Sequence, residues 1–204
     1  MCETYLRIAR ILPADGGDGM QIHVMPPSLL PSVYRQTGIL TISVDDYFAL
    51  SLDLGPISPE VLPKLMECAD RYAAVRYAIR ILSCGMYNKQ QLARKLYLKG
   101  YSEKAIRHAV SFVVRCGYVD EQAQIESYMR VCVERRAYGR RKIWGLLLKH
   151  GYAREDIEDA FKAYTDEDFE DSKRAFLLRR FGKLNPETAE EAEAFRKVLH
   201  NHGF

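Results

Sequence analysis

Residues 96–101 read Leu96-Tyr97-Leu98-Lys99-Gly100-Tyr101, and the same pattern returns twice along the chain. It recurs 51 residues later as Leu147-Leu148-Lys149-His150-Gly151-Tyr152, and again as Leu199-His200-Asn201-His202-Gly203-Phe204. Each copy is a helix-forming run followed by Gly and an aromatic residue. After the first two copies the match continues, because Ser102, Ile106 and Ala109 align with Ala153, Ile157 and Ala160. A period of about 50 residues predicts a stack of small units that cannot bury their cores alone.

Each unit is expected to contain three helices. In the first unit, apolar spacing and Gly stops predict helices over 73–84, 88–99 and 103–115, with N-caps at Asn88 and Ser102. The second unit follows the same plan over 119–165. The third begins near Glu167, with Pro186 expected in the first turn of its next helix.

Residues 1–55 have a different pattern. Two β-prone runs, 4–11 and 21–25, flank a Gly- and Asp-rich stretch, and 39–44 and 47–54 are further strand candidates. A helix is expected to follow Ser58, which precedes Glu60. The predicted fold is mainly α: tandem three-helix repeats forming an elongated curved array, with a small N-terminal antiparallel β region. The expected segments are a β-rich region (1–58), a linker helix with the first repeat (59–118), the second repeat (119–165) and an incomplete third repeat (166–204).

Composition limits the possible function. The chain has 204 residues, 48% of them hydrophobic, which is enough to bury a core. It has no apolar run long enough for a membrane span and no signal-peptide pattern at its start, so a cytoplasmic protein is expected. The five Cys residues include no C-x-x-C pair, and Cys84, Cys116 and Cys132 are expected to be small buried hydrophobes. No metal or cofactor is expected.

Enzyme chemistry is not supported by the sequence. It contains no P-loop, no G-x-S-x-G and no H-E-x-x-H motif. The acidic residues clustered over 166–171 fit a solvated helix start, where negative charge favours the helix dipole, better than a Mg²⁺ site. We therefore expect no catalytic residues.

The net charge of +3 conceals an uneven distribution. Residues 1–70 hold 4 Lys/Arg and 9 Asp/Glu, residues 71–165 hold 19 and 9, and residues 166–204 hold 7 and 9. A basic middle between acidic ends indicates a polyanion or an acidic protein surface as partner. The alternative is an ordinary solvated helical surface.

Two groups of basic residues are the candidate binding residues. The denser group lies in the second unit: Arg130, Arg135, Arg136, Arg140, Arg141, Lys142 and Lys149. The first unit contributes Arg94, Lys95 and Lys99, although cations in the last turn of a helix also complement its dipole. Because Arg136 and Arg140 bracket a helix junction, their guanidinium groups are expected to converge on a carboxylate or phosphate.

Aromatic residues have two possible roles. Trp144, the single Trp, belongs either to the core or to an interface as an exposed anchor, with the core favoured. Packing between units is favoured over stacking on bases for Tyr97, Tyr101, Tyr118 and Tyr152.

Several motifs in this order resemble the RecX family of bacterial recombination regulators. They include Gln91-Leu92-Ala93-Arg94-Lys95-Leu96, Lys99-Gly100-Tyr101-Ser102-Glu103, Gly117-Tyr118-Val119-Asp120-Glu121, Arg135-Arg136-Ala137-Tyr138-Gly139 and Arg140-Arg141-Lys142-Ile143. The resemblance covers residues 73–165 well and 166–204 weakly. It implies a non-enzymatic regulator in DNA repair, homologous recombination and the SOS response. Such a protein binds the RecA recombinase filament on single-stranded DNA and inhibits its ATPase and strand exchange.

Three functions remain open at this point. The first is a monomeric RecA regulator that docks on the filament, for which charge reversal at Arg136 and Arg140 should weaken inhibition. The second is a helical protein that binds single-stranded nucleic acid directly through the same basic residues, with a steep salt dependence. The third is a passive scaffold that only bridges partners.

Overall fold

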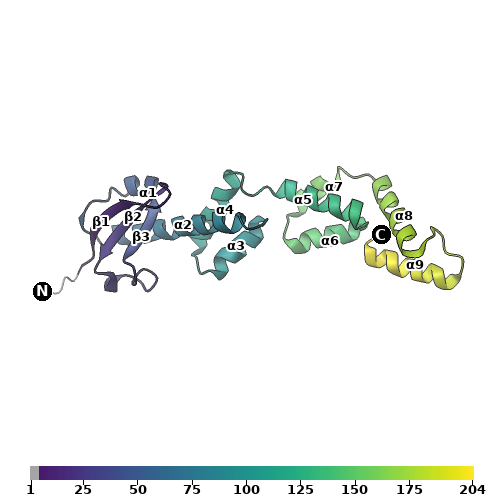
Figure 1. Ribbon diagram of the computed structural model, residues 1–204, viewed down its shortest axis with the longest axis horizontal. Helices are drawn as coiled ribbons and strands as arrows, with labels where there is room; N and C mark the ends of the chain where they lie inside the picture. Colours follow the sequence, from purple (N-terminus) through teal and green to yellow (C-terminus); the bar gives the residue numbers. More distant parts are fainter. Residues whose placement is uncertain (1–4) are drawn as a thin grey trace. The chain divides into compact units, whose positions relative to one another are not determined.

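The computed structural model describes residues 5–204, which form two compact units, one ending at Val119 and one beginning at Asp120. The first unit combines a four-stranded antiparallel sheet with a helical bundle (Figure 1). The second unit is built from helices. This confirms the mainly α fold with a small N-terminal β region. Among the described residues, no helix is both long and apolar enough to cross a membrane.

The sheet has the strand order β3-β2-β1-β4. Strands β1 and β2 form the hairpin predicted from their β-prone runs, and Ile8 pairs with Val24 in its register. The strand bounds are β1 Arg7–Pro13, β2 Gly19–Met25, β3 Ile39–Ser43 and β4 Gly55–Pro56, with a short 3-10 helix, Pro27–Leu29, between β2 and β3.

The strand expected over 47–54 is wrong, because residues 47–49 belong to the helix α1 (Val44–Ala49) and residues 50–54 form turns and irregular backbone. The hydroxyl of Ser43 accepts a hydrogen bond from the backbone N–H of Asp46 (3.1 Å), which caps the helix. Asp45 and Asp46 lie in its first turn, where negative charge is favourable. Local capping therefore overrides the strand-like composition.

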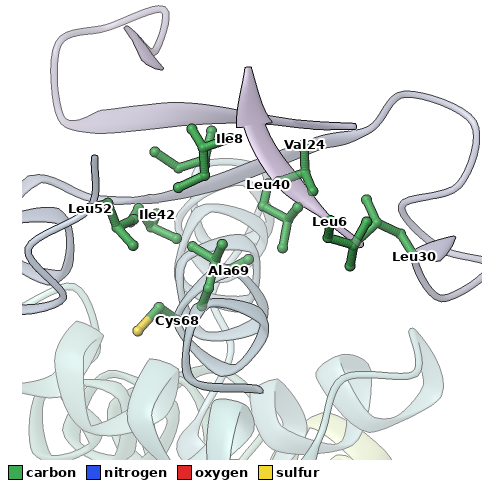
Figure 2. Packing of buried hydrophobic residues seen from close by; sticks show 11 residues of the cluster. Leu6, Ile8, Val24, Leu30, Leu40, Ile42, Leu52, Cys68 and Ala69 are labelled. Carbon is green, nitrogen blue, oxygen red and sulfur yellow. The ribbon is translucent and has the colours of Figure 1, made fainter. Parts of the chain in front are cut away.

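The helix α2 (Val61–Leu82) joins the sheet to the helical bundle as one continuous element. The separate linker helix and the helix start at 73 were therefore wrong, and Pro63 is accommodated because it lies in the first turn. The N-terminal half contributes Leu65, Cys68 and Ala69 to the core that it shares with the sheet, and Figure 2 shows Ala69 on the side of the helix that faces the strands. The C-terminal half buries Ala74 and Ala78 among the helices that follow.

Polar contacts of Asp18, in the turn between β1 and β2, also link the sheet to α2. The hydroxyl of Tyr72 donates to one oxygen of Asp18 (2.9 Å), and the guanidinium of Arg76 contacts the other oxygen (2.7 Å). The hydrogen bond from Tyr72 and the charge of Arg76 lower the pKa of the Asp18 carboxyl. Because of these Asp18 contacts and the continuous helix α2, the N-terminal sheet is part of the first unit.

The first three-helix repeat is completed by α3 (Lys89–Leu98) and α4 (Glu103–Arg115). Asn88 is fully buried and forms a capping box with Gln91, as predicted. Ser102 caps α4 and also donates its hydroxyl to Asp70 of α2. The core between these helices contains Leu92 and Leu96, which are 0% exposed.

The second unit contains five α-helices and one π-helix in its described residues. Their bounds are α5 Glu121–Arg130, the π-helix η2 Val131–Arg135, α6 Arg140–His150, α7 Arg154–Phe161, α8 Asp166–Phe181 and α9 Ala189–His202. Asp120 caps α5 as expected, and Thr165 and Asp168 form a capping box at the acidic start of α8. Pro186 lies before α9, whose N-cap is Thr188, so its expected place in the first helical turn is wrong.

The cysteines divide into two buried and two exposed residues among those described. Cys68 and Cys132 are buried, whereas Cys84 and Cys116 are exposed just beyond the ends of α2 and α4. The expectation of burial was therefore right for Cys132 and wrong for Cys84 and Cys116. Cys84 and Cys116 lie in the turns that follow α2 and α4, and these turns are exposed.

Candidate interaction surface

The segment between α5 and α6 carries the densest basic cluster on an unusual backbone. The helix α5 widens into the π-helix η2, and Ala137 then adopts a positive φ of 49°. The hydroxyl of Ser172, from α8, donates to the carbonyl of Val133 in this segment (3.2 Å). Because π-turns and positive φ at Ala are unfavourable, tertiary contacts must stabilise this segment.

One of these contacts is made by Arg179 of α8. Its Nη1 donates to the carbonyl of Arg135 (3.2 Å) and its Nη2 to the carbonyl of Arg136 (3.5 Å). Arg135 and Arg136 thus have fixed main chains and exposed side chains. Sequence reasoning missed Arg179, because no local signal connects residues more than 40 positions apart.

The N-terminus of α6 has three consecutive cations, Arg140, Arg141 and Lys142, and no acidic residue in its first turn. It also has no side-chain cap. Instead, the N–H of Gly139 donates to the carbonyl of His202 (2.8 Å). Positive charge at a helix N-terminus opposes the helix dipole, so these cations do not stabilise α6 through its dipole.

Aromatic rings support several of these cations. The Lys142 ammonium lies 4.1 Å from the centroid of the Tyr138 ring, and the Arg136 guanidinium lies 5.9 Å from it. The Arg140 guanidinium lies instead over Phe169 at 4.7 Å and contacts Asp166 at 3.0 Å. The expected convergence of Arg136 and Arg140 is therefore replaced by a pairing of Arg136 with Lys142 on one ring.

The remaining predicted cations of the second unit are all exposed. Arg141 directly precedes Lys142 in the sequence. Arg130 is the last residue of α5 and lines a surface pocket together with Glu126 and Asp159. Lys149 lies in the last turn of α6, about two turns beyond Lys142, where it complements the helix dipole. The structure thus places Arg136 and Lys142 at the Tyr138 ring. Arg141 precedes Lys142 in the chain and is exposed, and Lys149 lies further along the helix.

The predicted binding residues of the first unit lie on or just after α3. The Lys95 ammonium lies 4.7 Å from the Tyr87 ring centroid, and the Lys99 ammonium lies 6.0 Å from that of Tyr77. Arg94 is exposed on the same helix. Lys95 and Lys99 therefore lie over different rings.

The aromatic residues considered in the sequence differ in how far they are buried. Tyr101 packs on Tyr77 within the first unit, with ring centroids 5.8 Å apart. Tyr97 and Tyr118 are 73% and 54% exposed, so neither is buried in the core of the first unit. Trp144 is half-buried against Phe161 in the core of the second unit, which agrees with the favoured core role.

A histidine lies close to the same basic group. The His202 ring stacks on Phe176 with centroids 3.8 Å apart and meets the edge of Tyr138 at 5.2 Å. Burial, and then the charges of Lys142 and Arg179, lower the pKa of His202. Among residues 5–204, no three His, Cys, Asp or Glu side chains are grouped so that they could hold a metal ion.

Comparisons with known proteins give consistent results. Residues 74–112 match the model of the RecX first three-helix domain. The regulatory protein RecX of Caldanaerobacter subterraneus is 30% identical over 168 residues, which is 80% of this chain and 81% of that protein. The regulatory protein RecX of Pelodictyon phaeoclathratiforme is 33% identical over 136 residues, covering 64% of this chain and 81% of that protein.

Two crystal structures share the fold. A regulatory protein RecX has a TM-score of 0.74 at 17% identity and covers 98% of this chain and 94% of its own. RecX from Lactobacillus salivarius has a TM-score of 0.59 at 20% identity and covers 66% of this chain and 88% of its own.

Proposed function

Because the chain belongs to the RecX family of regulatory proteins, we propose that it regulates the RecA recombinase. In this proposal it binds the RecA filament on single-stranded DNA and inhibits or modulates ATP hydrolysis and strand exchange, without catalysing a reaction itself. It acts as a cytoplasmic monomer in homologous recombination, DNA repair and the SOS response. It needs no cofactor for this role.

The observation that carries the proposal is the basic group of Arg136, Arg141 and Lys142 in the second unit. The contacts with Arg179 and Ser172 fix the backbone beneath it, and the Tyr138 ring supports two of its cations. Cations that are already held in place lose less side-chain entropy on binding. This favours binding to a specific anionic surface over nonspecific electrostatic attraction. Carboxylates of a protein filament and phosphates of its DNA are both suitable ligands.

The structure refines the choice of residues for a test. Arg140 is bound to Asp166 and lies over two rings of the core, so reversing its charge would disturb the fold as well as any partner contact. Arg136 and Arg141 are exposed, and their side chains have no ion pair in the described part of the chain. The double variant Arg136→Glu/Arg141→Glu therefore tests binding with less damage to the fold.

The test is a titration of the DNA-dependent ATPase of RecA with the wild-type chain, this double variant and a matched control. The control, Arg196→Glu/Lys197→Glu on α9, changes the net charge equally at two exposed positions. We expect the wild type and the control to inhibit, and the double variant to need about tenfold more protein. Equal inhibition by all three would reject the role of this basic group. No inhibition by the wild type would reject the regulatory function.

A second candidate function is direct binding to single-stranded nucleic acid. The observation that favours it is Tyr97, which is 73% exposed on α3 between Arg94 and Lys99 in sequence. Exposed aromatics among cations provide stacking surfaces for bases. This function predicts tight binding to bare single-stranded DNA, with a log–log salt slope of about −0.7 per neutralised phosphate. It also predicts a loss of affinity in Tyr97→Ala.

A further inference from the structure

His202, at the end of α9, is held between two aromatic rings within the second unit. Its imidazole stacks on Phe176 of α8 with ring centroids 3.8 Å apart, and it meets the edge of the Tyr138 ring at 5.2 Å. The main chain is fixed as well, because the carbonyl of His202 accepts from the N–H of Gly139 at 2.8 Å. Within residues 5–204, neither ring nitrogen of His202 makes a hydrogen bond. The imidazole is therefore held in place while its nitrogens stay available to a proton and a ligand.

Three cations gather around these rings. The Lys142 ammonium lies 4.1 Å from the Tyr138 centroid, and the Arg136 guanidinium lies 5.9 Å from it. The guanidinium of Arg179 is fixed by its bonds to the carbonyls of Arg135 and Arg136, at 3.2 Å and 3.5 Å. The charges of Lys142 and Arg179 both act on His202. All of these groups belong to the second unit.

The three cations have no opposite charge beside them. In the part of the chain that the structure describes, Arg136, Lys142 and Arg179 make no ion pair. The nearby acidic residues of α8 are paired with other cations, Asp166 with Arg140 and Glu170 with Lys173. Because like charges in a small region repel one another, a bound anion would relieve this repulsion. The arrangement therefore favours an anionic ligand.

The placement of the cations favours phosphate over carboxylate. Arg136 directly follows η2, Lys142 lies in the first turn of α6, and Arg179 comes from α8. They thus reach the Tyr138 ring from three separate segments. A phosphate group offers several strong acceptor oxygens in different directions, whereas a carboxylate offers two oxygens in one plane.

We propose that the second unit binds a phosphate group beside the Tyr138 ring, with Arg136, Lys142 and Arg179 as its cations, and that His202 takes up a proton when the anion binds. The protonated imidazole is the fourth positive group of the site, and its N–H donates to the anion. The third repeat thus supplies two of the four groups, Arg179 and His202.

The proton uptake follows from the charges around His202. The groups that face it are Tyr138, Lys142 of α6, and Phe176 and Arg179 of α8. Burial, and then the two positive charges, lower the pKa of His202 below its usual value of 6.5, so the ring is neutral at pH 7. A bound phosphate adds negative charge beside the ring and therefore raises that pKa. By reciprocity, a lower pH must strengthen anion binding while His202 titrates.

The site shares Arg136 and Lys142 with the proposed RecA contact, so this inference rests on the proposed function and adds a ligand and a pH dependence to it. Its experiment contains no RecA, and the two proposals can therefore fail separately. Inhibition of RecA without proton-linked anion binding would reject the phosphate site alone. Proton-linked anion binding without inhibition of RecA would reject the regulatory function alone.

The experiment is an NMR titration of the histidine ring signals of the full chain, with sulfate as the probe. Sulfate is a tetrahedral dianion like phosphate, and its charge does not change near neutral pH. Sodium chloride at equal ionic strength corrects for screening. His202→Gln identifies the His202 signal, and the signal of exposed His200 is the internal control. Lys142→Gln and Arg136→Gln remove cations of the site, and Lys149→Gln removes the same charge about two turns further along α6.

We expect sulfate to raise the pKa of His202 and to bind about three- to tenfold more tightly at pH 6 than at pH 7.5. Lys142→Gln and Arg136→Gln should weaken sulfate binding about fivefold, and Lys149→Gln should not. Without sulfate, Lys142→Gln should raise the pKa of His202, because a repelling charge is lost. A loss of folding alone would not produce this opposite pair of effects.

Three results would overturn the proposal. The first is no response of the His202 signal to about 100 mM sulfate beyond that to chloride. The second is equal sulfate affinity of Lys142→Gln, Arg136→Gln and Lys149→Gln. The third is an equal response to acetate, which would assign the site to carboxylates.

A parallel titration with single-stranded oligodeoxythymidine distinguishes the sources of the phosphate. The same proton uptake with the oligonucleotide would assign the site to the phosphodiesters of a nucleic acid backbone. A response to sulfate but not to the oligonucleotide would assign it to free phosphate or a terminal phosphate group.

Discussion

Gly139 and Gly203 lie in backbone contact, although 64 residues separate them in the sequence. A Cβ on Gly139 would overlap the carbonyl group of Gly203. The adjacent N–H of Arg141 donates to that carbonyl at 3.2 Å, which caps the first turn of α6 from a distant part of the chain. The φ of Gly139 is −74°, so the close approach, and not backbone conformation, requires glycine there.

This contact gives the first prediction. Gly139→Ala should lower the free energy of unfolding of the second unit by about 1–3 kcal/mol, because the added methyl group displaces the α9 end. Gly145→Ala in the middle of α6 is the matched control, since its added Cβ would meet nothing within 4 Å. That change should raise stability by about 0.5–1 kcal/mol. Urea titrations followed by the fluorescence of Trp144, the only Trp, report this unit specifically. Equal effects of the two substitutions would contradict the contact.

A second prediction concerns the cap of α3. Asn88→Ala should destabilise the first unit by about 1–2 kcal/mol, because Asn88 is fully buried and accepts from the N–H of Gln91 at 2.8 Å. Gln90→Ala, an exposed neighbour, should change stability by less than about 0.5 kcal/mol. Circular dichroism during thermal unfolding measures both. If Asn88→Ala lowered the stability only slightly, water would be replacing the Asn88 side chain as the cap of α3.

The third prediction follows from His202. Its pKa is lowered below the usual value of 6.5, so the unfolded state binds its proton more readily than the folded state. The stability that neutral His202 contributes is thus present above pH 6.5 and is lost as the pH falls below that value. In His202→Gln the decline in stability between pH 7 and pH 5 should be shallower. Urea midpoints followed by Trp144 fluorescence give this comparison.

The groups facing His202 are Lys142, Arg179, Tyr138 and Phe176. His200→Gln is the control on the same helix, because His200 is exposed. A pH dependence that is identical in wild type and His202→Gln would show that other groups cause the acid decline.

Thiol reactivity provides the fourth prediction. In a Cys2→Ser background, Cys84 and Cys116 should react rapidly with an alkylating reagent at pH 8, whereas Cys68 and Cys132 should react only after unfolding. Burial raises the pKa of the Cys68 thiol to about 11, which leaves about one molecule in a thousand as thiolate at that pH. Burial also raises the pKa of Cys132. Peptide mapping by mass spectrometry resolves the four sites, and fast labelling of Cys68 would contradict the packing of α2 on the sheet.

Local signals explain why many helix boundaries could be predicted. Asn88, Ser102 and Asp120 each precede a helix and accept a hydrogen bond from an N–H three residues later, an interaction within one turn. The prediction was wrong over 47–54, where strand-like composition competed with a local cap. It also divided α2, because the packing of Leu65 and Ala69 on a distant sheet extends that helix across the expected boundary.

The candidate site could be predicted only in part. The sequence identified the cations, since charge and clustering are properties of the residues themselves. It could not predict that Lys142, and not Arg140, joins Arg136 on the Tyr138 ring. The side-chain direction of Arg140 depends on Phe169 and Asp166, which lie on another helix.

By itself the sequence determined the repeat, the helix caps and the order of elements, because periodicity and capping act over a few residues. Only the tertiary structure decided which cations are exposed and which, like Arg140, contact residues of another helix. It also decided that the start of α8 packs on α6 and α7 through Phe169 and Asp166. These outcomes depend on contacts between residues distant in sequence, such as Arg179 with Arg135 and Phe169 with Arg140. Such contacts form only after the helices have packed.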